Sequence, residues 1–112
     1  MKEGGDFVGL EVKKIVQGSS LIFTLKGILD ISTTNLISSQ LEKIENIEVL
    51  VFDFSKLEFI DSTGIGSILE AIHLSQEKSF SIRLQGVDEL TDHVFETVGL
   101  NHILRAVQEE EA

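Results

Sequence analysis

The sequence VLVFDFSKLEFIDSTGIG, residues 49–66, joins the most hydrophobic segment of the chain to the start of an amphipathic helix. Its first residues, Val49 to Phe52, form a continuous apolar run that ends at Asp53. Such a run is typical of a central parallel strand that is covered on both faces. After a loop, apolar side chains recur at the i, i+3, i+4, i+7 spacing of a helix, at Ile65, Ile68, Leu69 and Ile72. The stretch therefore predicts a strand, a loop and a helix.

On the N-terminal side we expect two strands and a helix. Apolar side chains alternate over residues 7–12 and again over 21–26, as they do in strands. Residues 17–20, Gln-Gly-Ser-Ser, have the composition of a turn, so the two strands should form an antiparallel hairpin. A helix should follow, with an apolar stripe of Leu36, Ile37, Leu41 and Ile44. Its candidate N-caps are Ser32, Thr33 and Thr34.

On the C-terminal side the alternation continues. Phe80 to Leu84 predicts a strand, Leu90 to Val98 a helix with Gly99 as its C-terminal cap, and Leu100 to Val107 a short last helix. The order predicts one α/β domain over residues 1–112, with a mixed sheet of an N-terminal hairpin plus parallel strands, and helices packed on it. We expect residues 1–6 and the acidic tail 108–112 to be solvated.

Composition narrows the classes of function. The 112 residues include no cysteine, which excludes disulfides, thiolate catalysis and cysteine-ligated zinc. Nineteen Asp and Glu oppose nine Lys and Arg, and the net charge of −10 disfavours binding to nucleic acids or anionic membranes. No apolar run is long enough for a signal peptide or a membrane span. We therefore expect a cytoplasmic protein without cofactor or metal.

Chemistry should gather at the loop before the helix that starts near Ser62. In open α/β sheets, functional residues lie beyond the carboxyl ends of the strands. The simplest interpretation is that Asp61 or Ser62 caps the helix. A hydroxyl there could also accept a phosphate, because a helix N-terminus favours negative charge. Gly64 and Gly66 would suit either a close approach by a partner's backbone or close packing of helix on sheet.

Three segments resemble one family. Asp61 to Gly66, Asp-Ser-Thr-Gly-Ile-Gly, is similar to the Asp-Ser-(Ser/Thr)-Gly-(Leu/Ile)-Gly motif of STAS-domain anti-sigma factor antagonists. Gly27 to Asp30 resembles the Gly-x-Leu-Asp motif that closes the second strand of that family. Val94 to Leu100 resembles its last helix and Gly-Leu exit. The resemblance spans residues 7–107 in the same order of elements.

The resemblance implies a phosphorylation switch. Ser62 matches the phosphorylated serine, with Thr63 as the fallback acceptor, and Asp30 and Asp61 match acidic positioning or recognition residues. The implied kinase is the anti-sigma factor itself, an ATP-binding protein of the histidine-kinase-like ATPase fold. The unphosphorylated antagonist binds that kinase and frees a sigma factor. Phosphorylation releases the antagonist, and a PP2C-type phosphatase regenerates its unphosphorylated form. Thr63, Gly64, Ile65, Gly66 and Glu70 complete the expected partner-binding region.

The helix that begins near Ser62 carries a further expectation. With the stripe from Ile65 to Ile72 in the core, the other faces should expose Ser67, Glu70, Ala71, Leu74 and Ser75. Ile65 should lie near the rim of the partner surface. Charge at Glu70 would then be available to a docked protein.

Other interpretations have weaker support. A serine hydrolase would need Gly-x-Ser-x-Gly and a base, but Ser62 lacks the elbow pattern and the histidines, at 73, 93 and 102, are isolated. Asp53, Glu58 and Asp61 could hold Mg²⁺, although loop acids more often are solvated or cap helices. Gly64-x-Gly66 is only a fragment of a nucleotide-binding pattern. The main alternative to a switch is a constitutive STAS-type subunit of a signalling assembly or lipid-transport ATPase. We expect no enzyme activity.

Overall fold

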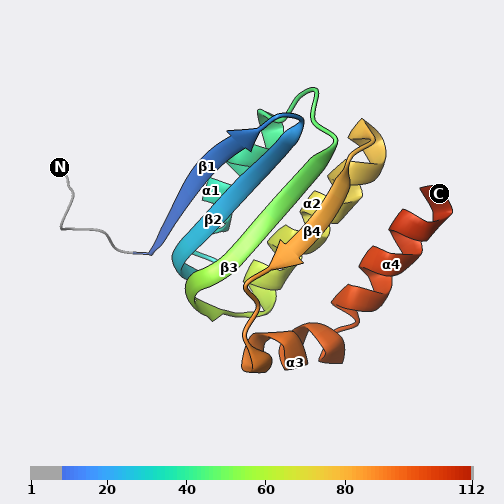
Figure 1. Cartoon of the computed structure of the whole chain (residues 1–112). Coiled ribbons are helices and arrows are strands. Elements are labelled where there is room, and N and C mark those ends of the chain that lie inside the picture. Colours follow the sequence, from blue (N-terminus) through green and yellow to red (C-terminus); the bar gives the residue numbers. More distant parts are fainter. Residues whose placement is uncertain (1–8, 112) are drawn as a thin grey trace, which may run out of the picture.

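The computed structural model describes residues 9–111. Its mixed four-stranded sheet has the order β1-β2-β3-β4. The strands are β1 (Leu10–Gln17), β2 (Ser20–Leu29), β3 (Val49–Ile60) and β4 (Ser81–Gln85). The helices are α1 (Thr34–Glu42), α2 (Ser62–Lys78), α3 (Glu89–Thr97) and α4 (Leu100–Glu111). The predicted α/β class and order of elements are confirmed (Figure 1).

The N-terminal hairpin forms as predicted. β1 pairs antiparallel with β2, from Leu10 opposite Gly27 to Gln17 opposite Ser20. Gly18 takes a left-handed backbone, φ 62°, which lets the chain reverse within Gly18 and Ser19. The part of the first predicted strand at residues 7 and 8 lies outside the described residues, as does the expected solvated segment 1–6.

β3 is parallel to both of its neighbours, as the apolar run at Val49–Phe52 predicted. The predicted loop after Asp53 was wrong, because the strand continues to Ile60. Its pairing with β2 shifts between Thr24 and Lys26 and again between Gly27 and Ile28. An extra residue at a bulge breaks the alternation of apolar and polar side chains, which is why the sequence of this half resembled a loop.

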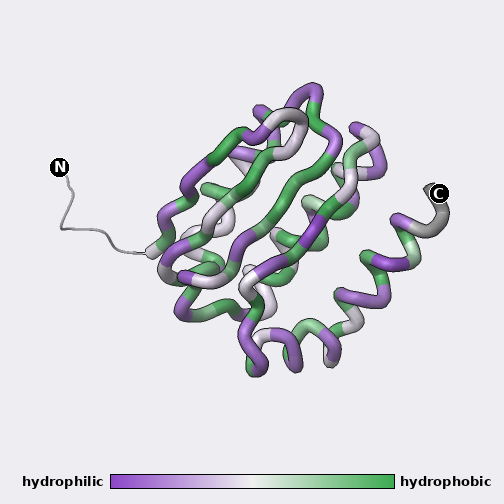
Figure 2. The backbone as a smooth tube through the Cα atoms, viewed as in Figure 1, coloured by the Kyte–Doolittle hydropathy of each residue, from purple (hydrophilic) through white to green (hydrophobic). Residues whose placement is uncertain are grey.

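The core lies between the sheet and the helices. In Figure 1, α1 and α2 lie behind the sheet and leave its front face without a helix over it. Four aromatic rings run through the core in edge-to-face and stacked pairs, with centroid separations of 5.8, 6.2 and 5.5 Å, from Phe23 through Phe52 and Phe54 to Phe95. Figure 2 shows the hydrophobic segments along β2, β3 and α2. Leu50, Val51 and Phe52 are buried as their continuous apolar run predicted, but helices cover only one of the two faces of β3.

α2 buries a wider face than the one predicted. Ile65, Ile68 and Ile72 are buried as expected, but Leu69 is 36% exposed. The residues expected on the outer faces include three that are buried: Ser67, Ala71 and Ser75. α2 contacts the sheet, α1 and α4, so small side chains on its flanks are enclosed by neighbouring helices.

α3 begins and ends one residue earlier than predicted, whereas α4 is longer than predicted. Gly99, φ 78°, provides the left-handed turn after α3, in agreement with its predicted role. α4 continues through Glu111, so residues 108–111 are the last turn of a helix rather than a tail beyond it. The Gln108 side chain accepts a hydrogen bond from the Ile82 backbone N–H at 2.7 Å, which ties α4 to β4.

Candidate functional site

The carboxyl ends of β2 and β3 bring the predicted acidic residues to one edge of the sheet. Leu29 and Ile60 are paired across these parallel strands, so Asp30 and Asp61 are the residues that follow a shared position. The Asp61 backbone N–H donates to Leu29 O at 3.4 Å. Two segments far apart in the sequence, residues 27–30 and 61–66, therefore form one surface.

Asp61 is the N-cap of α2. Its Oδ1 accepts the Gly64 backbone N–H at 2.9 Å, while its carbonyl accepts the N–H of Ile65 at 2.9 Å. Ser62 is thus the first helical residue, and both Ser62 and Thr63 are exposed. Among the described residues, the Ser62 hydroxyl takes part in no hydrogen bond. Capping by Asp61 leaves the Ser62 side chain free of that structural task.

Asp30 closes the neighbouring turn. Its Oδ1 accepts from the Ser32 hydroxyl at 2.7 Å and the Ser32 backbone N–H at 2.9 Å. These hydrogen bonds, led by the hydroxyl, hold the pKa of the Asp30 carboxyl below its ordinary value. Asp30 is therefore ionised at neutral pH, beside the start of α2.

Thr33 precedes α1 but does not cap it through its side chain. The hydroxyl instead donates to Ile28 O at 2.9 Å and accepts from the Asp30 N–H at 3.0 Å. This buried side chain therefore fixes the turn that carries Asp30. Of the predicted N-caps, Thr33 has the right position and a different function.

The two glycines of the motif differ in their surroundings. A Cβ on Gly64 would clash with Leu29 O and would lie 2.9 Å from side-chain atoms of Leu29 and Ile60. Gly64 is thus required for close packing of α2 on the strand ends. A Cβ on Gly66 would meet nothing within 4 Å. Gly66 is exposed and leaves the surface next to Ser62 without a side chain.

The other expected contact residues are divided between surface and core. Ile65 is only 4% exposed, so its predicted place near the rim was wrong. It packs in the core because it lies on the same face of α2 as the buried Ile68 and Ile72. Glu70 is exposed and accepts a hydrogen bond from the Ser38 hydroxyl of α1 at 3.1 Å. Glu70 therefore lies on the exposed side of α2, where a partner could contact it.

Sequence reasoning missed an apolar rim around this surface. Ile31 is 77% exposed and Phe59 is 53% exposed, and Phe59 pairs with Ile28 across the two strands. Ile31 lies in the turn after Asp30, and Phe59 lies just before Asp61. The sequence does place a large apolar residue close to each acidic residue, Ile31 after Asp30 and Phe59 before Asp61. Because residues 54–60 were expected to form a loop, Phe59 was not assigned to a strand end.

The alternative sites do not assemble within the described residues. His73 is exposed and lies 3.3 Å from Glu77, and His93 and His102 are exposed on separate helices. No group of three metal-ligating side chains converges in the part of the chain that the structure describes. No helix among the described residues has the length and apolar composition to cross a membrane.

Asp53, one of the candidate Mg²⁺ ligands, has other partners. Partial burial acts to raise its pKa, but hydrogen bonds from Ser55 and Gln85 and the charge of Lys56 lower it overall. The Ser55 N–H donates to Oδ1 at 2.9 Å and the Gln85 amide to Oδ2 at 3.3 Å. Its carboxylate therefore secures the first bulge of β3.

The family model of the STAS domain matches residues 11–112. The chain belongs to the STAS family. The fold of this STAS domain is similar to that of a sulfate transporter family protein from Wolinella succinogenes, with a TM-score of 0.72, 20% identity, and coverage of 81% of this chain and 75% of that one.

Two solved anti-sigma factor antagonists are also similar to the STAS domain. Unphosphorylated SpoIIAA matches with a TM-score of 0.65 and 19% identity, over 79% of this chain and 82% of that one. An anti-sigma factor antagonist from Mycobacterium paratuberculosis matches with a TM-score of 0.68 and 18% identity, over 85% and 82%. At these identities the similarity establishes the fold alone.

Proposed function

We propose that this STAS domain is an anti-sigma factor antagonist, a non-enzymatic cytoplasmic protein whose partner binding is controlled by phosphorylation of Ser62. Unphosphorylated, it binds an anti-sigma factor serine kinase of the histidine-kinase-like ATPase fold and so frees a sigma factor. A PP2C-type phosphatase reverses the modification. Neither nucleic acid nor membrane is a partner in this scheme.

The observation that carries the proposal is the position of Ser62 on α2. Asp61 performs the capping, so the exposed Ser62 hydroxyl is not needed to hold the helix. Gly66 leaves open space on the same turn, which a kinase active site needs in order to reach the hydroxyl. Thr63 is also exposed and is the alternative acceptor.

Electrostatics supports a switch without refolding. A phosphate would add about −1.5 to −2 charges at neutral pH. It would lie beside Asp61 and the ionised Asp30, on the edge where Glu58 is also exposed. A hundredfold loss of affinity requires about 2.8 kcal/mol. Like charges pressed together at an interface cost several kcal/mol, which is enough.

The surroundings of Ser62 also support a protein partner. Ile31 and Phe59 supply exposed apolar area on either side of the acidic pair. Interfaces commonly combine exposed apolar side chains such as these with polar ones. The exposed residues Thr63, Gly66 and Glu70 extend this surface along α2, and we propose that they contact the kinase.

The test is the phosphorylation state in the native host. Protein purified with phosphatases inhibited is digested with trypsin, and the peptide that follows Lys56 and ends at Lys78 is sequenced by tandem mass spectrometry. We expect phosphate on Ser62, its loss in Ser62→Ala, and its retention in Thr63→Ala. Phosphate on Thr63 would keep the mechanism and move the site.

A binding assay with the host's anti-sigma factor kinase separates the switch from a constitutive module. Ser62→Ala should bind constitutively, whereas Ser62→Asp should bind at least tenfold more weakly, about 1.4 kcal/mol. If neither variant changes binding and no phosphate is found, the constitutive STAS subunit is the better interpretation. Similarity of fold does not separate the two, since it extends to a sulfate transporter family protein as well as to antagonists.

A further inference from the structure

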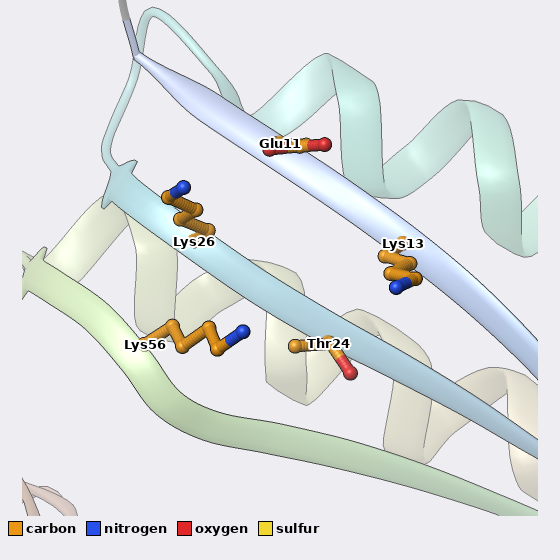
Figure 3. A pocket seen from close by; sticks show the side chains of 5 residues that line it. All are labelled: Glu11, Lys13, Thr24, Lys26 and Lys56. Carbon is orange, nitrogen blue, oxygen red and sulfur yellow. The ribbon is translucent and has the colours of Figure 1, made fainter.

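The face of the sheet opposite the helices contains a pocket of about 200 Å³. It is lined by Glu11, Lys13, Thr24, Lys26 and Lys56, and Figure 3 shows these side chains projecting from β1, β2 and β3 above the sheet. By the same measure of volume, one water needs only about 10–15 Å³. The pocket is therefore large enough for a small ligand, and it lies on a different surface from Ser62.

The register of the strands assembles this pocket. Lys13 is paired with Thr24, and Glu11 with Lys26, across β1 and β2. The first bulge in β3 lies between Asp53 and Lys56, the partners of Thr24 and Lys26. Without the extra residue, Lys26 would face Ser55 and Lys56 would point to the other side of the sheet. Bulges often re-aim a side chain at a functional site, and this one adds the third lysine.

The bulge is held by dedicated contacts. Asp53 Oδ1 accepts the Ser55 N–H, and Gly86 packs so closely that its Cβ would lie 2.7 Å from both Asp53 Oδ1 and Ser55 N. Gly86 also has a left-handed backbone, φ 69°, which favours glycine. Asp53, Ser55 and Gly86 therefore stabilise the bulge, and the bulge places the Lys56 side chain on the pocket face of the sheet.

The pocket carries more positive than negative charge, because three lysines and one carboxylate, that of Glu11, line it. Lys26 and Lys56 are directly opposite each other on neighbouring strands, an arrangement of like charges that destabilises a sheet. Among the described residues, no carboxylate lies within 4 Å of the ammonium groups of Lys13, Lys26 or Lys56. Three of the nine Lys and Arg of a chain with net charge −10 thus gather around one threonine hydroxyl.

We propose that this pocket binds the phosphate group of a small phosphorylated molecule. The lysine ammonium groups and the Thr24 hydroxyl supply donors and positive charge for a dianion. Glu11, at the rim, can accept a hydrogen bond from a hydroxyl on the rest of the ligand. A bound dianion would attract both Lys26 and Lys56 and so offset the repulsion between them.

The test is an NMR titration of the ¹⁵N-labelled chain with sodium phosphate and, separately, with glycerol phosphate, at ionic strength held constant with sodium chloride. Saturable shifts at the amides of Lys13, Thr24 and Lys56 with both probes support a site for the phosphate group itself. Tighter binding of glycerol phosphate supports an organic ester as the ligand. If the shifts do not saturate by roughly 10 mM probe, the dissociation constant is too high for a specific site, and the proposal is overturned.

Matched variants separate a site from general attraction. Lys56→Gln should weaken binding by about tenfold, the loss of one charge-assisted hydrogen bond. Lys14→Gln makes the same change of charge next to the pocket, but Lys14 is paired with the buried Phe23 and so faces the helices. It should leave the affinity unchanged. Equal weakening by both variants overturns the proposal, and Lys26→Gln replaces Lys56→Gln if circular dichroism shows loss of folding.

Discussion

Replacing Gly64 by alanine tests how tightly α2 is seated on the sheet. The new methyl group would collide with Leu29 O and would lie 2.9 Å from side-chain atoms of Leu29 and Ile60. The carbonyl belongs to β2, and that strand is paired on both sides, so α2 must move instead. Gly66→Ala is the matched control, because its methyl group would meet nothing within 4 Å.

The comparison of the two variants isolates the packing cost. Both substitutions gain about 1 kcal/mol of helix propensity, so this gain cancels in their difference. Overpacking in a rigid site costs about 1–3 kcal/mol. For a chain of 112 residues, 1 kcal/mol corresponds to roughly 4 °C in Tm. Gly66→Ala should therefore melt above the wild type, and Gly64→Ala roughly 4–12 °C below Gly66→Ala.

The assay is thermal unfolding followed by far-UV circular dichroism. The chain has neither Trp nor Tyr, so intrinsic fluorescence is not a useful signal. Equal Tm values for the two alanine variants would refute the reasoning. They would mean that α2 can lift from Leu29 without cost, and the close packing at the motif would not be a constraint on sequence.

Two further predictions concern the polar groups that fix the helix starts and turns. Asp88 caps α3 by accepting the Thr91 N–H at 2.7 Å, and this bond, with the Thr91 hydroxyl, lowers the pKa of Asp88. A lowered folded-state pKa stabilises the protein above the ordinary value of 3.8 and ceases to do so as pH falls through the folded value. At pH 7, Asp88→Ala should therefore have a lower Tm than the wild type, and this difference in Tm should disappear in acid. A difference in Tm that does not depend on pH would contradict the reasoning. Thr33→Val leaves Ile28 O and the Asp30 N–H without their partner and should cost about 1–3 kcal/mol in urea unfolding, whereas a cost near zero would show that the turn does not depend on the hydroxyl.

Local patterns were sufficient to predict the order of elements. The alternation in residues 21–26, the turn at Gly18 and the helical spacing from Ile65 to Ile72 each depend on neighbours along the chain. The same holds for the position of Ser62 at a helix start, which follows from a strand, a short connection and a helix in sequence. The sequence left Asp61 and Ser62 as candidates for the N-cap of α2, and the structure assigns this role to Asp61.

What the sequence could not supply depends on tertiary contacts. Ser67, Ala71 and Ser75 are buried because α1 and α4 flank α2, and nothing local distinguishes them from surface residues. The second half of β3 was obscured by its bulges, since a shifted register cannot be read without the partner strand. The exposure of Phe59 and the gathering of Lys13, Lys26 and Lys56 follow from that register, so both were beyond sequence reasoning.

The contact between Gln108 and Ile82 has a consequence for the outer border of the sheet. β4 is an edge strand, and an unpaired edge is a template on which a foreign strand can be added. Here a side-chain amide from the last helix occupies the Ile82 N–H as a fifth strand's carbonyl would. α4 thus occupies one donor of this edge, and a foreign strand could pair with Ile82 only if Gln108 gave up this hydrogen bond.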